Sequence, residues 1–430
     1  MKRLFTVLLL AVCIAASAQT TSIKHSSPLR ETAAKKAGMS AERLSRLDRM
    51  FEQAVAEGDV PGVVALVARH GKIVYYQAFG LADNASGRAL KRDDIFRIAS
   101  QTKAITSTAV MMLWEEGKFR LDDPISKYIP EFKNPQVLDT YDAADKYTTK
   151  PAKSEITIRH LLTHTSGLGY GEIDGDARFK EIYRHAGIID AFTTKAVTIG
   201  DNVKKLAKLP LHHNPGEKFT YSEGLDVLGY LIEIASGMPF DAFLRQRLFD
   251  PLAMHDTWFY LPEAKAARLV PVQRPKDGQW ERFPVTWYDP EYPVTGARMF
   301  FAGGAGLSGT AEDYATFLQM YLNGGELDGK RILSRKTVET IMANQVGELL
   351  GGRTGATHYG LAFGVLTETG QVQGGKGSAG TFEWGGYFNT QYFADPREQV
   401  LGVLMKQTQG TSRDRTSELF RLLVMQAIDD

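Results

Sequence analysis

The chain has 430 residues, with 51 Lys and Arg against 50 Asp and Glu, and 43% of its residues are hydrophobic. This is the composition of an ordinary globular protein, which excludes a disordered chain, a collagen-like repeat and a disulfide-stapled miniprotein. The formal net charge of +1 argues against a protein that binds nucleic acids or anionic membranes, because both need a marked basic excess. Cys13 is the only cysteine, so the rest of the chain has no disulfide, cysteine nucleophile or Cys-ligated zinc.

The first 18 residues have the pattern of a secretory signal peptide. A basic start, Met1-Lys2-Arg3, is followed by an apolar run from Leu4 to Ala16 and by small residues up to Ala18. This pattern predicts cleavage after Ala18 and a secreted or periplasmic mature chain of residues 19–430. A membrane anchor is the alternative, but the run is shorter than the roughly 20 apolar residues that a spanning helix needs. Lipidation at Cys13 is disfavoured because the residue before it is bulky and the apolar run continues after it.

A helix and a hairpin are predicted before residue 80. Ser40 is a typical helix N-cap, and large apolar residues then recur at helical spacing up to Gly58, which predicts the first helix. The runs Gly62 to Arg69 and Lys72 to Phe79 are rich in β-branched and aromatic residues. Because His70-Gly71 alone separates them, they are predicted to form a β-hairpin with a two-residue turn.

The middle of the chain is predicted to be mostly helical, beginning with a helix from Ser100 to about Gly117. Two polar segments, Asp139 to Ser154 and Pro262 to Gln279, are predicted to be surface loops. The β pattern returns only late in the chain. Three strands and a closing amphipathic helix are predicted there, at His358 to Thr367, Thr381 to Ala394, Gln399 to Lys406 and Ser412 to Ile428.

This order of elements predicts an α/β fold, in which one antiparallel sheet is built from both ends of the chain and flanked by helices. The α/β part is expected at about residues 40–97 and 300–430, and an inserted, mostly helical part at about 98–299. A doubly wound parallel sheet would need strands that alternate regularly with helices, and the sequence lacks that alternation.

A serine and a lysine three residues apart, Ser100 and Lys103, open the helix that follows the hairpin. On a helix this spacing places both side chains on one face, within reach of each other. A lysine can take a proton from a serine hydroxyl where burial or nearby positive charge makes it less basic, and a helix N-terminus favours the negative charge that develops on an attacked carbonyl. The pair is therefore a candidate nucleophile and base. The alternative is an N-cap serine followed by a surface lysine, although no other Ser-x-x-Lys occurs in the chain.

Further motifs accompany this pair in a fixed order. They are Ile98 to Lys103 (IASQTK), Leu161 to Leu168 (LLTHTSGL), Pro215 to Ser222 (PGEKFTYS), Leu228 to Tyr230 (LGY), Pro251 to Met254 (PLAM), Gly304 to Thr310 (GAGLSGT) and Glu383 to Gly386 (EWGG). This set, which spans nearly the whole mature chain, resembles the serine β-lactamase and penicillin-binding-protein superfamily, in particular its class C-like branch. The resemblance implies a β-lactamase/DD-peptidase-like fold with Ser100 as the nucleophile.

Tyr221 matches the tyrosine of the family's second motif, so the resemblance implies that it relays a proton between the serine oxygen and the leaving group. A phenol held near an ammonium group loses its proton more readily, which fits that role. Glu223 stands where the family usually has asparagine, and we expect it among the substrate-binding residues, with its carboxylate paired with Lys103. The alternative for Tyr221 is a residue at a helix start that packs on the core. The literal Tyr-x-Asn triplets at 321–323 and 387–389 are set aside, the first as a helix end and the second as part of a late strand.

Trp384-Gly385-Gly386 resembles the third motif of the family, which lies on a strand at the edge of the site. Glycines in a strand let a substrate backbone approach closely. The resemblance makes all three residues substrate-binding, and it assigns the oxyanion hole to the backbone N–H groups of Ser100 and Tyr387. Trp-Gly-Gly is most similar to the family VIII carboxylesterases. A β-lactamase has a cation at the first position, so tryptophan there weakens the binding of anions and offers an aromatic wall. Lys376-Gly377-Ser378, in a glycine-rich loop, is the weaker candidate for this motif.

The remaining motifs indicate no metal and no cofactor. His160 and His164 have the spacing of metal ligands but lack the glutamate of His-Glu-x-x-His, and His164 is expected to cap or hydrogen-bond within its turn. His212-His213 is expected to be an exposed loop pair without an acidic partner. Gly-x-Gly-x-x-Gly occurs at Gly304 to Gly309 and at Gly375 to Gly380, but neither opens a βαβ unit. The sequence has no Gly-x-Ser-x-Gly, which disfavours an α/β-hydrolase.

The sequence thus predicts a secreted serine hydrolase that forms an acyl-enzyme on Ser100, with Lys103 and Tyr221 as proton acceptors. The leading hypothesis is a carboxylesterase on short acyl esters, which leaves room for weak β-lactam hydrolysis. Its partner is a small-molecule ester or amide, with no nucleic acid, no membrane span and no signal for an oligomeric state. The alternatives are a β-lactamase or D-Ala-D-Ala carboxypeptidase and, from another class, a non-catalytic binder of cell-wall fragments.

Overall fold

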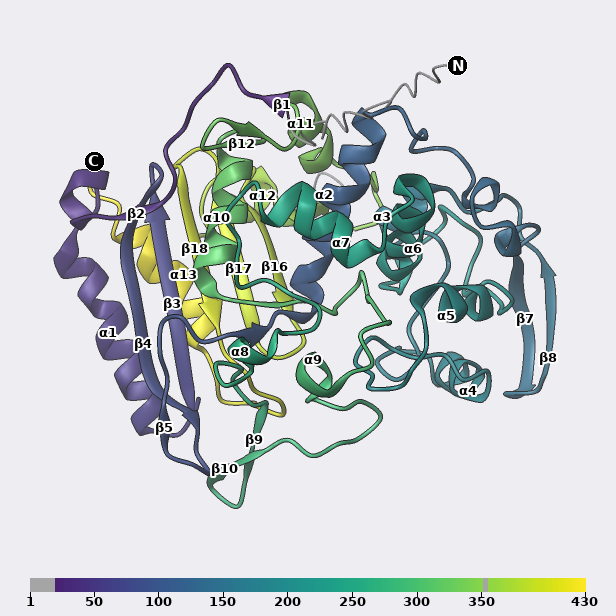
Figure 1. Cartoon of the computed structure of the whole chain (residues 1–430), viewed down its shortest axis with the longest axis horizontal. Coiled ribbons are helices and arrows are strands. Elements are labelled where there is room, and N and C mark those ends of the chain that lie inside the picture. Colours follow the sequence, from purple (N-terminus) through teal and green to yellow (C-terminus); the bar gives the residue numbers. More distant parts are fainter. Residues whose placement is uncertain (1–19, 351–354) are drawn as a thin grey trace, which may run out of the picture.

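The computed structural model describes residues 20–350 and 355–430, so the predicted signal peptide and Cys13 lie outside the described residues. The largest sheet within these ranges has nine strands, and all pairs except β2 with β4 are antiparallel (Figure 1). In sheet order the strands are β14 (Thr357–Tyr359), β15 (Gly364–Leu366), β16 (Phe382–Gly386), β17 (Thr390–Asp395), β18 (Val400–Met405), β3 (Gly62–Arg69), β4 (Lys72–Asp83) and β2 (Arg30–Glu31), with β5 (Arg88–Ala89) paired to β4. Because β18 pairs with β3, the predicted α/β fold with a sheet built from both chain ends is confirmed.

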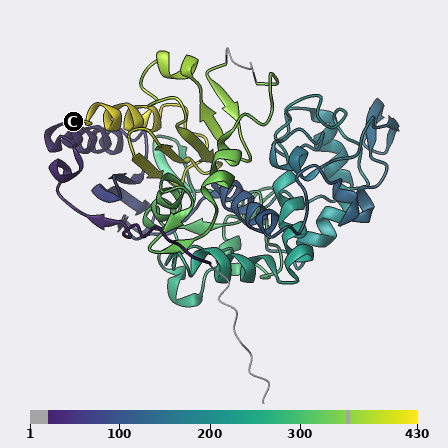
Figure 2. The same ribbon diagram turned by 90° about the horizontal axis from the view of Figure 1, so that it is seen from above.

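Helices cover both faces of this sheet. On one face α1 (Ala41–Ala56) packs beside α13 (Thr416–Gln426), and on the other face lie α2 (Thr102–Glu115) and α10 (Ala311–Leu322), as Figures 1 and 2 show. Beyond α2 the chain forms a largely helical region. The other helices are α3 (Ile158–Leu162), α4 (Ala177–His185), α5 (Ile199–Leu206), α6 (Gly224–Ser236), α7 (Phe240–Leu244), α8 (Glu263–Ala266), α9 (Tyr292–Thr295), α11 (Arg335–Met342) and α12 (Glu368–Val372). The limits given above for the α/β and helical parts stay a prediction.

The central strand β3 is buried along its whole length because helices pack on both of its faces. Val63 and Val67 belong to the cluster formed with α1 and α13, whereas Val64 and Leu66 belong to the main core. Successive side chains of a strand point to opposite faces, so a strand covered on both sides needs an unbroken apolar sequence. This explains why residues 62–69 lack polar alternation.

The first predicted helix and the predicted hairpin are both confirmed. The side chain of Ser40 accepts a hydrogen bond of 3.2 Å from the backbone N–H of Arg43 and so caps α1. Between β3 and β4, His70 and Gly71 have φ angles of 50° and 72°. Positive φ at both central residues is the conformation of a tight two-residue hairpin turn.

Two late segments that were predicted to be single strands are hairpins instead. The segment 358–367 forms β14 and β15 with Ala362 at φ 68° between them, and 381–394 forms β16 and β17 with Asn389 at φ 70° in the turn. A residue in the left-handed region ends an extended strand, and neither position has the glycine that usually signals it. The triplet at 387–389 therefore lies in a turn and not in a strand.

The two segments that were predicted to be loops also contain strands. Residues 139–154 fall mostly in the hairpin of β7 (Gln136–Ala143) and β8 (Lys146–Pro151), and residues 273–282 form the hairpin of β9 (Gln273–Lys276) and β10 (Gln279–Arg282). These strands are polar and largely exposed, so hydrophobic alternation does not reveal them. The remaining short strands are β1 (Thr20–Thr21), β6 (Phe96–Arg97), β11 (Ser308–Gly309), β12 (Glu326–Leu327) and β13 (Lys330–Arg331).

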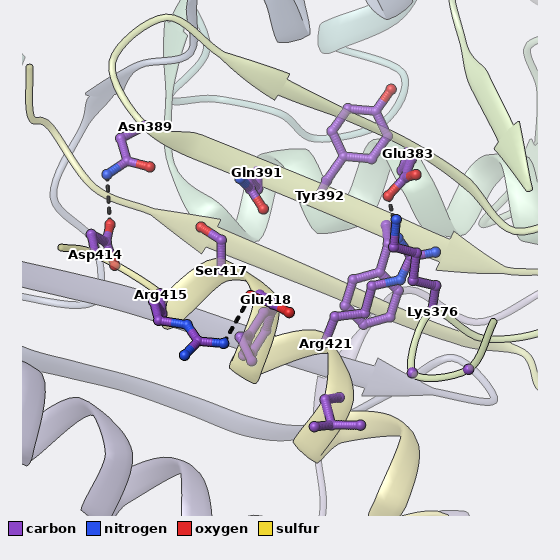
Figure 3. A pocket seen from close by; sticks show the side chains of 15 residues that line it. Lys376, Glu383, Asn389, Gln391, Tyr392, Asp414, Arg415, Ser417, Glu418 and Arg421 are labelled. Atoms are coloured by element: carbon purple, nitrogen blue, oxygen red, sulfur yellow. Dashed lines mark hydrogen bonds and ion pairs between the residues drawn. The ribbon is translucent and has the colours of Figure 1, made fainter. Parts of the chain in front are cut away.

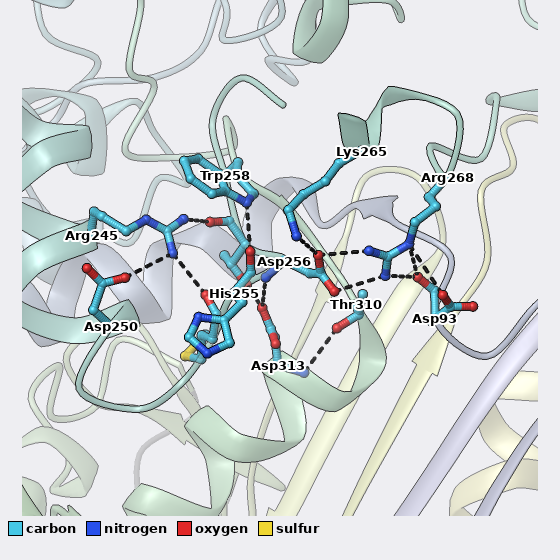
Figure 4. A network of polar contacts seen from close by, with 12 residues as sticks. Asp93, Arg245, Asp250, His255, Asp256, Trp258, Lys265, Arg268, Thr310 and Asp313 are labelled. Atoms are coloured by element: carbon cyan, nitrogen blue, oxygen red, sulfur yellow. Dashed lines mark hydrogen bonds and ion pairs between the residues drawn. The ribbon is translucent and has the colours of Figure 1, made fainter. Parts of the chain in front are cut away.

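A network of polar side chains fixes the segment before α8 to the first turn of α10 (Figure 4). The Asp256 carboxylate accepts hydrogen bonds of 2.9 Å from Arg268 and 2.5 Å from Lys265. The Asp313 carboxylate accepts bonds of 2.8 Å from the Asp256 N–H and the Thr257 hydroxyl. Burial raises the pKa of Asp313 to about 6. The segment then pairs with β11, which pairs with β6, so the network supports the strand that leads to the Ser-x-x-Lys pair.

Within residues 20–350 and 355–430, no single helix is both long enough and apolar enough to cross a bilayer. One bent pair, Gly224–Ser236 with Phe240–Phe249, passes that test by length and composition only, with an angle of 78° at its break.

Candidate active site

Ser100 lies in a short 3-10 turn, η2 (Ala99–Gln101), between β6 and α2. Ala99 has φ 44°, a left-handed conformation that is uncommon for a residue with a side chain and that clusters at functional sites. Arg97 fixes this junction, because its fully buried guanidinium donates to the carbonyls of Pro290 at 2.5 Å and Val270 at 2.7 Å. The chain therefore turns sharply just before Ser100 and presents it, half-buried, at the start of α2.

Lys103 occupies the first turn of α2 and is completely buried. Its Nζ donates hydrogen bonds to the Ser100 hydroxyl at 3.4 Å, the Tyr170 hydroxyl at 2.9 Å and the Gly304 carbonyl at 2.7 Å. An ammonium group has three protons to donate, so these acceptors satisfy all of them. The lysine is thus held against the serine, and the alternative of a surface lysine is wrong.

Tyr221 lies just before α6 and its ring faces Lys103. The Lys103 Nζ lies 4.5 Å from the centre of the Tyr221 ring, within the range of a cation–π contact. The indole N–H of Trp384 donates a hydrogen bond of 3.3 Å to the Tyr221 hydroxyl. The structure therefore brings together the first motif, the tyrosine of the second and the tryptophan of the third.

His164 packs against Tyr221. Its ring centre lies 4.5 Å from that of Tyr221, and its Nδ1 accepts a hydrogen bond of 3.1 Å from the backbone N–H of Ser222. Burial, with Lys103 nearby, lowers the pKa of His164 well below its ordinary value, so the ring is neutral. The expected bond within its own turn is replaced by this bond to the turn that carries Tyr221.

Gly386 lets β16 approach the serine turn closely. A Cβ on Gly386 would lie 2.4 Å from the Ile98 carbonyl and 2.2 Å from the Thr390 hydroxyl, both inside van der Waals contact. The next residue is Tyr387, and neither its backbone N–H nor that of Ser100 has an acceptor among the described residues. Two free N–H groups beside a hydroxyl are the arrangement that an oxyanion hole requires.

Aromatic rings surround the side chain of Tyr387, the residue that follows β16. The Tyr387 ring centre lies 6.2 Å from those of Phe192 and Trp287 and 6.1 Å from that of Tyr288. Trp287 is partly exposed, whereas Phe192 and Tyr288 are buried. An apolar group bound beside the oxyanion-hole candidates would therefore meet an aromatic wall.

Glu223 does not take the place expected for it. Its side chain is only 1% exposed, so it cannot contact a substrate in this conformation, and among the described residues the Lys103 Nζ donates to Ser100, Tyr170 and Gly304 and not to the Glu223 carboxylate. Its carboxyl group instead lies at hydrogen-bonding range of Asp190. The sequence offered no sign of this contact, because the two residues come from separate loops.

The two glycine-rich segments, at residues 303–309 and 374–380, lie in different parts of the structure. A Cβ on Gly303 would lie 2.3 Å from the Leu225 carbonyl, and one on Gly304 would lie 2.6 Å from the Asp226 carboxylate, so this segment allows close packing against α6. Lys376 instead lines a separate pocket of about 640 Å³ between α13, β16 and β17 (Figure 3). Trp384, and not Lys376, thus stands beside Tyr221.

The other histidines have structural partners. His160 forms a capping box with Thr157 at the start of α3, and His213 is buried beside Thr220. The expectation that His212 is exposed and without an acidic partner is wrong, because it lies 3.2 Å from the Asp174 carboxylate and its side chain is 12% exposed. In the part of the chain that the structure describes, no three His, Cys, Asp or Glu side chains are grouped to hold a metal ion.

Sequence reasoning missed two residues of the site, Tyr170 and Asp226. Tyr170 accepts the hydrogen bond from Lys103 described above, and Asp226 accepts one of 3.1 Å from the backbone N–H of Gly304. Burial raises the pKa of Asp226 to about 6, although Lys103 lowers it. Tyr170 directly follows the LLTHTSGL motif, so its closeness to a motif was the available signal.

Comparisons with known proteins identify the family of this chain. The Beta-lactamase family model matches residues 47–425. Esterase EstB from Burkholderia gladioli is 34% identical over 383 residues, which cover 85% of this chain and 90% of EstB. Lovastatin esterase from Penicillium rubens is 29% identical, over 83% of this chain and 91% of its own length. The solved structure of EstCE1, a hydrolase with promiscuous acyltransferase activity, matches with a TM-score of 0.76 at 26% identity, over 90% of this chain and 98% of EstCE1. This chain is therefore a serine hydrolase and belongs to the β-lactamase family.

Proposed function

We propose that the protein is a carboxylesterase that hydrolyses short acyl esters through an acyl-enzyme on Ser100. The observation that carries this proposal is the contact of the Ser100 hydroxyl with the buried Lys103 ammonium, beside a phenol that Trp384 holds by a hydrogen bond. A non-catalytic binder would need none of these contacts. The esterase relatives support an ester as the substrate.

In the acylation step the Ser100 oxygen attacks the ester carbonyl, and its proton passes to the neutral amine form of Lys103 or to the phenolate form of Tyr221. The backbone N–H groups of Ser100 and Tyr387 hold the oxyanion that forms. The intermediate then expels the alcohol, which takes up the proton, and the acyl group stays on Ser100. In the second step water attacks the acyl group, the same side chains accept its proton and pass it to the Ser100 oxygen, and the acid leaves with Ser100 restored.

Trp384 supports the preference for neutral esters over anionic β-lactams or peptides. It brings an indole ring to the position where a lysine would bind a carboxylate, and the rings around Tyr387 extend the apolar wall. A charge-assisted hydrogen bond is worth roughly 1.5 to 3 kcal/mol, and a substrate carboxylate would lack it here. β-Lactam hydrolysis is proposed only as a weak second activity.

Labelling the nucleophile tests the proposal. We expect a fluorophosphonate to lose fluoride and to leave one adduct, which mass spectrometry places on Ser100. Ser100→Ala should abolish both the adduct and ester hydrolysis while the protein stays folded. Ser45→Ala, which alters a partly exposed serine of α1, is the matched control and should behave as the wild type does. An adduct on another residue, or activity that persists in Ser100→Ala, would refute the proposal.

A substrate panel separates the ester hypothesis from its alternatives. p-Nitrophenyl acyl esters should have the highest kcat/KM, followed by a chromogenic cephalosporin and a D-Ala-D-Ala peptide. Fastest turnover of the peptide or of the cephalosporin would replace the carboxylesterase by the corresponding alternative. Binding of cell-wall fragments without turnover of any substrate would favour the non-catalytic binder.

We also propose that the protein acts outside the cytoplasm, as the signal-peptide pattern of residues 1–18 suggests. N-terminal sequencing of protein recovered from the periplasm or the medium should begin at Gln19. Protein found only in the cytoplasm with an intact N-terminus would refute this.

A further inference from the structure

The carboxyl group of Glu223 is buried without a donor. The side chain is 1% exposed, and neither oxygen accepts a hydrogen bond from an N–H or O–H group of the described residues. An ionised carboxylate in such a place would carry the full cost of desolvation. The surroundings therefore favour a neutral carboxylic acid.

Asp190 faces Glu223 and, unlike Glu223, has hydrogen-bond donors beside its carboxyl oxygens. The two side chains lie at hydrogen-bonding range, which two carboxyl groups can use only if one of them carries a proton. The oxygens of Asp190 accept backbone hydrogen bonds of 3.1 Å from Gly171 and 2.6 Å from Glu172. The Asp190 oxygens are therefore already acceptors, whereas the Glu223 oxygens accept nothing, so Glu223 is placed to be the donor in a bond between the two side chains.

We propose that Glu223 is a positioning residue, whose neutral carboxyl group donates a hydrogen bond to Asp190 and so fastens the turn of Tyr221 to the loop of Tyr170. Glu223 and Asp190 hold the residues directly before and after Tyr170. The Glu223 N–H donates to the Gly169 carbonyl at 3.1 Å, and Asp190 holds the N–H of Gly171.

This arrangement acts on the reacting groups through the two phenols. Tyr170 and Tyr221 contact Lys103 from different loops, and the Glu223–Asp190 contact ties those loops together. Glu223 thus helps to hold Lys103 at the Ser100 hydroxyl, although it touches no substrate. The effect of Glu223 on turnover rests on the proposed function. The protonated state of Glu223 and its contact with the Tyr170 loop can be tested without any substrate.

The other titratable groups around Glu223 keep the proton in place. Burial, followed by Asp190 and then Asp226, raises the pKa of Glu223 well above its ordinary value, and only Lys103 acts against them. The groups that interact with Glu223 are Asp190 on the loop after α4, Asp226 on α6, Lys103 on α2, Tyr170 on the loop before α4 and Tyr183 on α4. Burial raises the pKa of both tyrosines as well, so Lys103 is the one cation in this set.

Two substitutions at Glu223 test whether its side chain acts as a neutral hydrogen-bond donor or as an ionised carboxylate. Glu223→Gln keeps the shape and donates from its amide at every pH, whereas Glu223→Ala removes the contact. We expect Glu223→Ala to lower kcat on a p-nitrophenyl ester by about tenfold or more, as for a lost hydrogen bond that leaves a buried partner unpaired, with KM little changed. Glu223→Gln should recover most of that loss.

Two measurements do not depend on turnover. At about pH 8, where Asp226 and Asp313 are ionised, the infrared spectrum should show the carbonyl stretch of a protonated carboxyl group that Glu223→Gln removes. Hydrogen exchange should show that the amides of Gly171 and Glu172 lose protection in Glu223→Ala but keep it in Glu223→Gln. Glu233→Gln, which alters a partly buried glutamate on α6, the helix that Glu223 directly precedes, is the matched control and should keep the Glu223 band and the protection.

A wild-type spectrum without a Glu223-dependent band would overturn the proposal. So would a Glu223→Gln protein that loses as much activity and amide protection as Glu223→Ala, because a carboxylate would then be required. If no ester is hydrolysed at all, the proposed function fails, and the spectrum and the exchange still decide the role of Glu223.

Discussion

The indole N–H of Trp384 donates a hydrogen bond to the hydroxyl of Tyr221. This bond links the third motif to the second, and it ends on the phenol oxygen that is proposed to accept a proton in its ionised form. Since the donor remains while the phenol ionises, it strengthens as negative charge develops on the oxygen. Trp384 therefore has two proposed roles, as an aromatic wall for the substrate and as a donor that stabilises the ionised Tyr221.

Trp384→Phe separates these two roles. Phenylalanine keeps an aromatic wall but cannot donate, so kcat on a short p-nitrophenyl ester should fall by about three- to tenfold, and KM should change little. Steady-state kinetics would show this split. A rise in KM at constant kcat would mean that the indole only binds the substrate.

Trp384→Lys tests specificity at the same position. The new cation supplies the anchor for a carboxylate, so the ratio of kcat/KM for a cephalosporin to that for an ester should rise about tenfold or more. Kinetics of both proteins on one ester and one cephalosporin give the ratio. An unchanged ratio would show that Trp384 does not occupy the anchor position.

Lys103→Arg tests proton transfer against simple charge. Arginine keeps the positive charge but is a poor base near neutral pH, and its planar group does not match the three acceptors around Nζ. Turnover should fall by roughly 10²-fold or more, in a protein whose thermal melting shows that it is folded. Activity close to that of the wild type would leave Tyr221 as the only base.

Gly386→Ala tests the close approach of β16 to the serine turn. The added Cβ would overlap the Ile98 carbonyl and the Thr390 hydroxyl, and backbone atoms cannot move aside as a flexible side chain can. We expect esterase activity and fluorophosphonate labelling to fall by about tenfold or more, since small displacements of catalytic groups are costly. The control is Gly175→Ala, whose Cβ would meet no atom within 4 Å, and equal effects of the two changes would contradict the prediction.

Asp313 predicts a pH dependence of stability. Its pKa rises from an ordinary 3.8 to about 6 in the folded protein, so the fold binds the proton more tightly than the unfolded chain does. Above both values the ionised carboxyl destabilises the fold by about 2 to 3 kcal/mol, and this penalty disappears as the pH falls to about 4. Asp313→Asn has no charge at this position at any pH. As the pH is lowered from about 8 to about 4, the free energy of unfolding of the wild type should therefore rise relative to that of the variant. Urea unfolding at several pH values measures this difference, and a difference that does not change with pH would contradict it.

The parts of this protein that sequence could predict are those with local patterns. The Ser40 cap, the two apolar runs around His70-Gly71 and the Ser-x-x-Lys pair each lie within a few residues, and the structure contains the helix, the hairpin and the Ser100–Lys103 contact. The hairpin at Asp277-Gly278 was missed although that dipeptide is a strong turn signal, because its strands are polar.

The contacts between distant loops could not be predicted in this way. His212 reaches Asp174, and Glu223 reaches Asp190, across more than 30 residues of chain. Each contact depends on how α4 and its flanking loops pack, and no periodicity in the sequence encodes that packing. The departure of Glu223 from the family pattern marked the position, but its partner became visible only in the structure.

The pairing of β3 with β18 also determines when this protein can fold during synthesis. The hairpin of β3 and β4 emerges from the ribosome early, yet residues 400–405, which complete the open edge of β3, are among the last to be made. Until then a strand that is apolar except for Arg69 exposes unpaired N–H and C=O groups, and such edges recruit other chains. The nascent protein therefore has to be shielded from aggregation for nearly the whole time of translation, and a chain truncated before residue 400 should aggregate rather than fold.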